Sequence, residues 1–436
     1  MWGARVGSRR GARGLAALVA VVVTVSLLGI AQAGAQQNPP VNQPGVTASE
    51  IRVGGVATVS NDPTGNTLGT AFDGTKAYFD SINASKDKGV CGRKLVLSSK
   101  RDDALANNRQ EVQGLISEDN VFAALPIATD LFTGADLLAS QGIPTFGWLI
   151  NPEWGSEDIN PGPPNLFGQN GSFLNLKSPA PSYYNEAWLA QKLNKKRIGV
   201  IAYNVPQSSG SADAVDATFQ KFPKAGKVVF KDTSLAFGAV DYSVQVSKMK
   251  DDKVNLVIPA LDANGAFTLA REMKKQGLNA TMILPNAYDQ ARIEKNADVA
   301  NGSYVFTLYA PFESKSKPAG LKLYEKWIKK SGGTKSENSY VGWLNADLFV
   351  RGLKAAGCDF TRQKVVDAIN QMTNYNADGI IAPVDWTKAH QQSPSCYSWL
   401  KVENGKFKPV FGQPGKPFLC FPPDLTSIPA NPEAVG

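Results

Sequence analysis

The sequence predicts an α/β protein with two lobes, each built on a parallel β-sheet. Short apolar runs of strand length alternate with helical segments of ten or more residues, which is the pattern of βαβ units. Residues 151–165 contain four prolines and two glycines, which favours a loop, and the alternation restarts after it. The chain of 436 residues is also longer than one ordinary hydrophobic core needs.

Before this loop, strands and helices alternate regularly. The strand segments are rich in β-branched and apolar residues. In the first helix, Phe72, Tyr78, Phe79 and Ile82 are spaced to share one side. The predicted strands are Ile51–Ser60, Lys94–Ser98, Val121–Pro126 and Ile143–Trp148, and the helices between them are Gly69–Ala84, Asn107–Ile116 and Asp130–Gln141.

After the loop, the same alternation predicts the second lobe. It begins with a helix and ends with a short strand. The predicted helices are Ser182–Leu193, Ala212–Phe222, Asp241–Lys250 and Asp262–Gln276, and the strands are Arg197–Tyr203, Lys227–Lys231, Val254–Pro259 and Thr281–Leu284. A long helical stretch, Leu321–Gln371, follows, and the sequence alone does not assign it to either lobe.

The chain contains four cysteines, and an even number of this kind favours disulfides in an exported protein. Four cysteines allow three pairings. Cys396 begins a strand-like run, Glu403-Asn404-Gly405 predicts a turn, and a second strand-like run precedes Cys420. Because a hairpin brings such ends together, we favour Cys396–Cys420, which leaves Cys91–Cys358.

The N-terminus predicts export. Four arginines and no acid precede an apolar run from Leu15 to Ala31, and small residues then follow at A-x-A spacing within residues 31–35. This order predicts a signal peptide over residues 1–35 that is cleaved, and the alternative is a retained membrane anchor. No cysteine follows the apolar run, so we expect no lipid anchor. Residues 36–47 predict a flexible leader, and residues 426–436 predict a flexible tail.

Charge and motifs exclude several classes of function. The four N-terminal arginines account for half of the net charge of +8, and no basic stripe remains, so no nucleic-acid partner is expected. No nucleophile elbow, Walker loop or dinucleotide fingerprint is present. The single histidine, His390, lies in a polar stretch and is predicted to be a solvated surface residue. Asp102-Asp103 and Asp251-Asp252 are predicted to be turn and cap residues. We therefore expect no enzyme activity, metal or cofactor.

The ordered set of segments resembles the type I periplasmic binding proteins, in particular the branched-chain amino acid branch. The resemblance covers residues 49–415. It rests on the opening strand, on a helix that leads into a glycine-rich turn, on an Asp-Asp pair followed by Asn-Asn, and on a late crossover. The segments that carry it are Ile51–Val59, Phe72-Asp73-Gly74, Ile82-Asn83, Gly89–Lys94, Asp102-Asp103, Asn107-Asn108, Gly142–Trp148, Asp378-Gly379-Ile380 and Val384-Asp385-Trp386.

The resemblance implies a discontinuous layout. Lobe one would contain residues 48–166 and 308–378, and lobe two would contain residues 167–307 and 379–425. Three crossovers would form the hinge, and the ligand would lie between the lobes. Parallel sheets independently favour that position, because they bind ligands at the carboxyl ends of their strands.

Several loops depart from the amino-acid-binding pattern of this family. In the family, hydroxyl and backbone groups of lobe one bind the ligand carboxylate, and tyrosines and an acid of lobe two bind its ammonium. The segments 127–131, 148–151, 207–210 and 285–289 do not show these residues in register, although Asp289 would serve if the register slipped. The implied ligand is amino-acid-like by family, yet we expect it not to be a plain branched-chain amino acid.

The candidate ligand-binding residues follow strand-like runs at the predicted cleft. Asp130 has an alternative role as the N-cap of its own helix, and Trp148 has an alternative role in packing within the lobe. An aromatic wall from Trp148 and Tyr288 would suit a less polar ligand. The candidates are Thr129, Asp130 and Trp148 in lobe one, and Ser209, Asp262, Asn286 and Tyr288 in lobe two.

The resemblance implies an exported, monomeric protein that captures a small molecule and delivers it to an ABC permease at the cytoplasmic membrane. The alternative is the ligand-sensing subunit of a signalling complex, which uses the same fold. Co-encoded neighbours discriminate between them: a permease pair with ATPases, or a membrane kinase.

Overall fold

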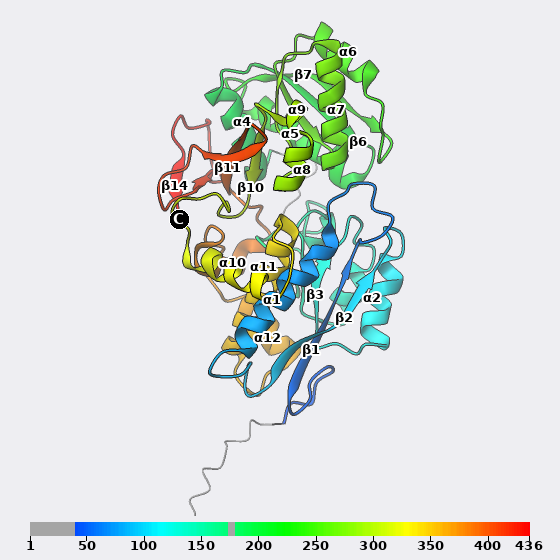
Figure 1. The fold of residues 1–436 in the computed structure, drawn as a ribbon, viewed down its shortest axis with the longest axis vertical. Helices are drawn as coiled ribbons and strands as arrows, with labels where there is room; N and C mark the ends of the chain where they lie inside the picture. The colour runs from blue at the N-terminus through cyan, green and yellow to red at the C-terminus, as the bar shows by residue number, and fades with distance from the viewer. Residues whose placement is uncertain (1–39, 173–178) are drawn as a thin grey trace, which may run out of the picture. The chain divides into compact units, whose positions relative to one another are not determined.

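The computed structural model describes residues 40–172 and 179–436. These residues form two lobes that each contain a parallel sheet, which confirms the predicted fold class (Figure 1). The predicted signal peptide lies outside the described residues. Among the helices that the described residues form, none combines the length and the apolar character needed to cross a membrane.

The sheet of lobe one contains five parallel strands in the order β2-β1-β3-β4-β5. The central strands β1 and β3 are largely buried, because a sheet covered by helices on both faces needs apolar residues on both sides. The strands are β1 (Glu50–Ala57), β2 (Lys94–Asp102), β3 (Ala123–Ala128), β4 (Thr145–Gly147) and β5 (Leu166–Gly168).

Helices cover both faces of this sheet (Figure 1). The long helix α11 lies directly against α1, although the two are far apart in the sequence. A Cβ atom at Gly74 would collide with the Ser339 carbonyl oxygen, and one at Gly342 would collide with the Ala71 carbonyl oxygen, so both glycines permit this close approach. One face carries α1 (Ala71–Asn83), α10 (Ala319–Lys330), α11 (Glu337–Ala356) and α12 (Arg362–Ile369), and the other carries α2 (Asn108–Ser117) and α3 (Ala135–Ser140).

The sheet of lobe two contains four parallel strands in the order β7-β6-β8-β9. Alternate residues of β6 point to opposite faces: Ile198 and Val200 pack on the side of α4 and α5, and Ile201 packs on the side of α6 and α7. The elements are α4 (Pro181–Lys192), β6 (Arg197–Tyr203), α5 (Pro206–Lys221), β7 (Lys227–Leu235), α6 (Ser243–Asp251), β8 (Leu256–Ala260), α7 (Ala263–Gln276), β9 (Thr281–Met282), α8 (Gln290–Lys295) and α9 (Ala297–Ala300).

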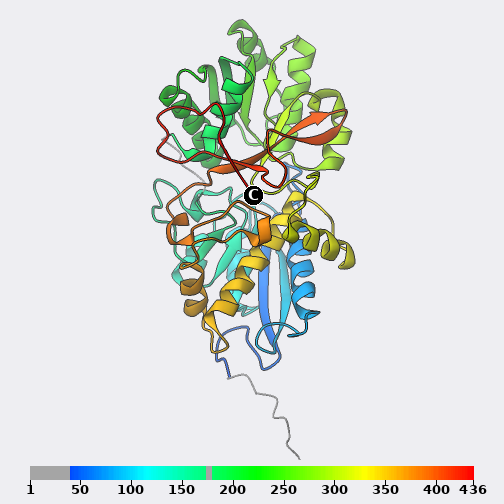
Figure 2. The same ribbon diagram turned by 90° about the vertical axis from the view of Figure 1, so that its left-hand side faces the viewer.

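A second, antiparallel sheet adjoins lobe two, with the order β10-β11-β13-β14 and β12 paired to β11. A bridge between Ile283 and Tyr304 connects it to the parallel sheet. The strands of this second sheet lie beside lobe two (Figure 2). The chain leaves lobe two after β10, forms α10 to α12 on lobe one, and returns through α13 (Trp386–Ala389) to β11. The residue bounds given above for the two lobes remain a prediction. The strands are β10 (Tyr304–Thr307), β11 (Cys396–Glu403), β12 (Lys406–Val410), β13 (Phe418–Cys420) and β14 (Glu433–Val435).

Both predicted disulfides are confirmed. Cys396 and Cys420 lie opposite each other on β11 and β13, with their Cα atoms 4.0 Å apart. Cys91 bonds to Cys358, with a Cα distance of 5.5 Å. This second bond joins the loop before β2 to the segment that follows α11. Each bond therefore fixes a late segment of the chain onto the lobe that it joins.

The flexible leader and tail were predicted wrongly where the structure describes them. Residues 40–47 pack against lobe one: Val46 forms a bridge with Ile51, and the Gln43 side chain accepts a hydrogen bond from the Arg362 N–H at 3.2 Å. Within residues 426–436, β14 pairs with β13, and Ile428 is buried. Polar, proline-rich composition does not reveal that such a segment will find an open strand edge to pair with.

The prediction that His390 is a solvated surface residue is also wrong. Its ring packs near Phe167 and Trp386, and its Nε2 atom lies 2.9 Å from the Asn370 side-chain oxygen. Burial lowers the pKa of His390 to about 4. The polar residues around it in sequence mark a turn, while the ring itself points inward.

Candidate ligand-binding site

A cavity of about 200 Å³ lies between the carboxyl ends of the two parallel sheets. Its walls come from loops that follow β1, β3 and β4 in lobe one and β6, β8 and β9 in lobe two. Of the seven predicted residues, Asp130, Trp148, Asp262 and Asn286 line it, and Thr129, Ser209 and Tyr288 do not. The cavity occupies the position at which sheets of this kind bind ligands.

Side chains of the two lobes meet at the cavity. The Gln207 side-chain amide of lobe two donates to the Asp130 carbonyl oxygen at 3.3 Å. The Asn264 amide at the start of α7 donates to the Pro63 carbonyl oxygen at 3.0 Å. Arg292 reaches the Asn66 side-chain oxygen at 3.5 Å. These contacts hold the loops after β1 and β3 against lobe two.

Asp130 faces the cavity without capping a helix. The helix predicted over residues 130–141 begins at Ala135, and its N-cap is Gly134, so the predicted N-cap role of Asp130 is wrong. Thr129 instead positions the loop: its hydroxyl donates to the Asp103 carboxylate, and it is almost completely buried. The segment Leu131–Gly134 separates Asp130 from the helix, which frees its carboxyl group for other partners.

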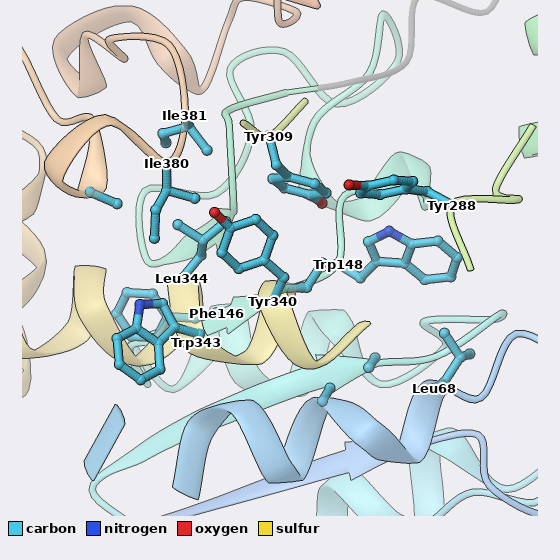
Figure 3. Close-up of a cluster of buried hydrophobic side chains, with 14 of the residues drawn as sticks. Leu68, Phe146, Trp148, Tyr288, Tyr309, Tyr340, Trp343, Leu344, Ile380 and Ile381 are labelled. Carbon is cyan, nitrogen blue, oxygen red and sulfur yellow. The ribbon is translucent and has the colours of Figure 1, made fainter. Parts of the chain in front are cut away.

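The predicted aromatic wall is half correct. Trp148 lines the cavity, with 6 % of its surface exposed, and it also belongs to the hydrophobic core of lobe one. The prediction that Tyr288 lines the cavity is wrong. Its ring stacks on Phe312, and its hydroxyl donates to Glu313 at 2.7 Å. Figure 3 shows Tyr288 in one buried cluster with Tyr309 and Tyr340.

In lobe two, Asp262 connects the cavity to helix α7. It is the N-cap of this helix: one carboxyl oxygen accepts the Gly265 N–H at 3.0 Å, and the other accepts the Tyr203 hydroxyl at 2.6 Å. Ser209, which the sequence predicted as a ligand-binding residue, does not line the cavity, because α5 begins at Pro206 and turns the Ser209 hydroxyl back onto the Val205 carbonyl. Ser208 lines the cavity instead.

Sequence reasoning missed part of the wall. Tyr183 and Glu186 lie on one side of α4, and Glu337 is the first residue of α11. A glutamate inside the aromatic helix sequence Tyr183-Tyr184-Asn185-Glu186-Ala187-Trp188 was the available signal, because buried helix positions rarely carry an acid without a function. Further wall residues are Gln169, Tyr203, Phe237 and Tyr309.

Burial raises the pKa of three acids in the cavity wall. Asp130 is 5 % exposed, and one of its carboxyl oxygens has no hydrogen-bond partner. Burial, with Asp62, Asp103 and Asp262 nearby, raises the pKa of Asp130 to about 8, and a hydrogen bond from Asn66 opposes part of this effect. Burial raises the pKa of Glu186 to about 8, and it raises that of Glu337 to about 8 against the influence of Arg292.

The described residues contain no cluster of three or more side chains able to hold a metal ion. The cavity wall offers hydrogen-bonding and apolar groups. Its chemistry suits reversible binding of an organic molecule.

A family model described as a periplasmic binding protein matches residues 50–406, most of the chain. The chain belongs to the periplasmic binding protein family. This confirms the resemblance that the sequence predicted. Membership in this family supports a solute-binding role and an extracytoplasmic location, and its members are binding proteins rather than enzymes. No curated protein sequence matches the chain.

Solved structures of periplasmic binding proteins share the fold at low sequence identity. The branched-chain amino acid ABC transporter protein of Thermus thermophilus, with bound valine, has a TM-score of 0.67 at 15% identity, over 83% of this chain and 95% of that one. The fatty acid ABC transporter substrate-binding protein of Thermomonospora curvata has a TM-score of 0.66 at 18% identity, over 85% of this chain and 94% of that one. An ABC transporter solute-binding protein of R. palustris, in complex with benzoate, has a TM-score of 0.64 at 16% identity, over 83% of this chain and 96% of that one.

Proposed function

We propose that this periplasmic binding protein captures a small molecule between its lobes outside the cytoplasmic membrane and delivers it, as a monomer, to an ABC permease. One observation carries the proposal. The cavity takes polar groups from both lobes, Asp130 from one and Asp262 from the other, so a bound molecule contacts both. Such a ligand stabilises the closed arrangement of the lobes, which a permease can distinguish from the open one.

Removing wall side chains is expected to abolish stabilisation by the ligand. A ligand at a hundred times its dissociation constant adds about 2.7 kcal/mol to the free energy of unfolding. Trp148→Ala and Asn286→Gly should each lose most of this gain, because closure needs contacts from both lobes. Glycine is chosen for Asn286 because the φ angle there is 48°, which glycine adopts without strain. Thermal-shift screening of a metabolite library against the parent, repeated on both variants, measures the effect.

Each shift is measured against the ligand-free melting temperature of the same variant, because Trp148 is also a core residue and its loss destabilises the fold. Trp327→Ala is the matched control: this half-buried tryptophan lies on α10, outside the cavity. The control should respond to the ligand like the parent. If both cavity variants also respond like the parent, the ligand binds elsewhere.

Leucine, isoleucine and valine are expected not to bind tightly. Asp289, the acid nearest to the family position, caps helix α8 through the Arg292 N–H at 3.0 Å and does not line the cavity. A ligand carboxylate near Asp130 would also meet a negative potential. Isothermal titration with each amino acid tests this prediction, and sub-micromolar affinity for any of them would contradict it.

A further inference from the structure

The ionisable side chains of the cavity wall share one sign. Among the wall residues that the structure describes, the acids are Asp130, Glu186, Asp262 and Glu337, and neither lysine, arginine nor histidine occurs. Burying a carboxylate away from water is costly unless a cation or hydrogen-bond donors compensate it. The protein supplies such donors to some of these acids and not to others.

Asp262 is fully compensated, and Asp130 is not. Both Asp262 oxygens accept hydrogen bonds, from the Gly265 N–H and the Tyr203 hydroxyl. Only 5 % of the Asp130 surface is exposed, and its Oδ2 atom has no hydrogen-bond partner. Glu186 is buried to the same degree, and its Oε2 atom also has no partner. Two buried carboxyl oxygens, one in each lobe, therefore lack a hydrogen-bond donor, and both belong to residues that line the cavity.

The surroundings of Asp130 favour positive charge. Asp62 and Asp103 of lobe one and Asp262 of lobe two all lie close enough to act on its carboxyl group. The remaining wall is aromatic on several sides, with Trp148, Tyr203, Phe237 and Tyr309. Aromatic faces attract cations and accept apolar groups, whereas they give nothing to a carboxylate.

We propose that the ligand is an organic cation with an apolar body, whose protonated nitrogen donates to the free Asp130 oxygen between the lobes. This inference rests on the proposed function and specifies its ligand class. The nitrogen N–H groups supply the donors that Asp130 lacks, and the aromatic side chains surround the rest of the molecule. A quaternary ammonium fits less well, because it has no N–H group to donate.

Binding of such a cation displaces a proton. In the empty cavity at neutral pH, the Asp130 carboxyl group holds its proton because its pKa is about 8. The ammonium lowers this pKa, the carboxyl O–H bond breaks, and the proton passes to the solvent while the carboxylate pairs with the ligand. Roughly one proton should be released for each cation bound near pH 7.

The test uses three series of probes with matched hydrocarbon parts: primary alkyl and arylalkyl amines, the corresponding alcohols, and the corresponding carboxylates. Thermal shift ranks them, and isothermal titration measures the responders. At least one amine should bind roughly tenfold or more tightly than its alcohol and carboxylate partners, the effect expected of a hydrogen bond to a charged group. An alcohol or carboxylate that binds as tightly as its amine overturns the proposal, and so does failure of every amine.

Substitution of Asp130 assigns the effect to this residue. Asp130→Asn should weaken the amine by roughly tenfold or more and abolish proton release, measured by titration in buffers of different ionisation enthalpy. Asp298→Asn is the control, because it removes one exposed acid on α9, outside the cavity. Equal amine affinity in Asp130→Asn and the parent overturns the proposal. Capture of a carboxylate or alcohol overturns the cation proposal alone, since solute binding as such would then be demonstrated.

Discussion

Asp130→Asn is expected to stabilise the ligand-free protein at pH 8 and to leave its stability almost unchanged at pH 4. Burial and three neighbouring acids raise the pKa of Asp130 from 3.8 to about 8 in the folded protein. Between these values the native state holds a proton that the unfolded chain has released. The free energy of unfolding of the parent therefore falls as the pH rises from about 4 to about 8. A neutral asparagine removes this contribution.

The expected gain in the free energy of unfolding follows from the difference between the folded and unfolded pKa values of Asp130. Each pKa unit corresponds to about 1.4 kcal/mol, which sets an upper bound of about 6 kcal/mol for Asp130 above pH 8. Rearrangement around the charged carboxylate reduces the expected gain to on the order of 3 kcal/mol. Urea unfolding of both proteins at several pH values measures it, with Asp298→Asn as the control that should follow the parent. Parallel curves for Asp130→Asn and the parent between pH 4 and pH 8 would contradict the prediction.

The sequence was sufficient to predict the two lobes, because periodicity records which residues are buried. Strand β6 was predicted with its observed limits, Arg197–Tyr203, since apolar residues fill both of its faces. The pairing of Cys396 with Cys420 was also predictable, because a hairpin is a local structure. The proximity of Cys91 to Cys358 follows from the packing of α11 on α1, which periodicity alone does not specify.

The candidate site was less predictable, because it depends on single residues rather than on patterns. Consecutive residues of a helix point about 100° apart. Because α5 begins at Pro206, earlier than predicted, Ser208 lines the cavity and Ser209 points away from it. Asp130 was identified, but its raised pKa depends on burial and on Asp62, Asp103 and Asp262, which come from distant loops. Glu186 lies on a helix in which every residue from Ser182 to Ala190 is buried, so no polar face marked its side.

Loss of the Cys91–Cys358 disulfide is expected to lower the free energy of unfolding by about 2–4 kcal/mol. The bond joins cysteines 267 residues apart, so it restricts the unfolded chain strongly. Loop-closure entropy alone would give about 5.6 kcal/mol, and residual structure in the unfolded chain reduces this value. Urea unfolding of the double variant Cys91→Ala/Cys358→Ala measures the loss. The variant Cys396→Ala/Cys420→Ala, which opens a loop with a separation of only 24 residues, should lose less.

The same double variant should retain its ligand affinity. Cys91 precedes the first residue of β2, whereas the cavity lies beyond the carboxyl ends of the strands. The nine residues of β2 at about 3.3 Å each place roughly 30 Å between the disulfide and that edge of the sheet. Stability should therefore fall while the dissociation constant of any ligand identified by the screen stays within about twofold. A large loss of affinity would show that the disulfide fixes the position of α11, and with it Glu337 at the cavity wall. Unchanged stability would show instead that the packing of α11 on α1 already holds this segment in place without the covalent bond.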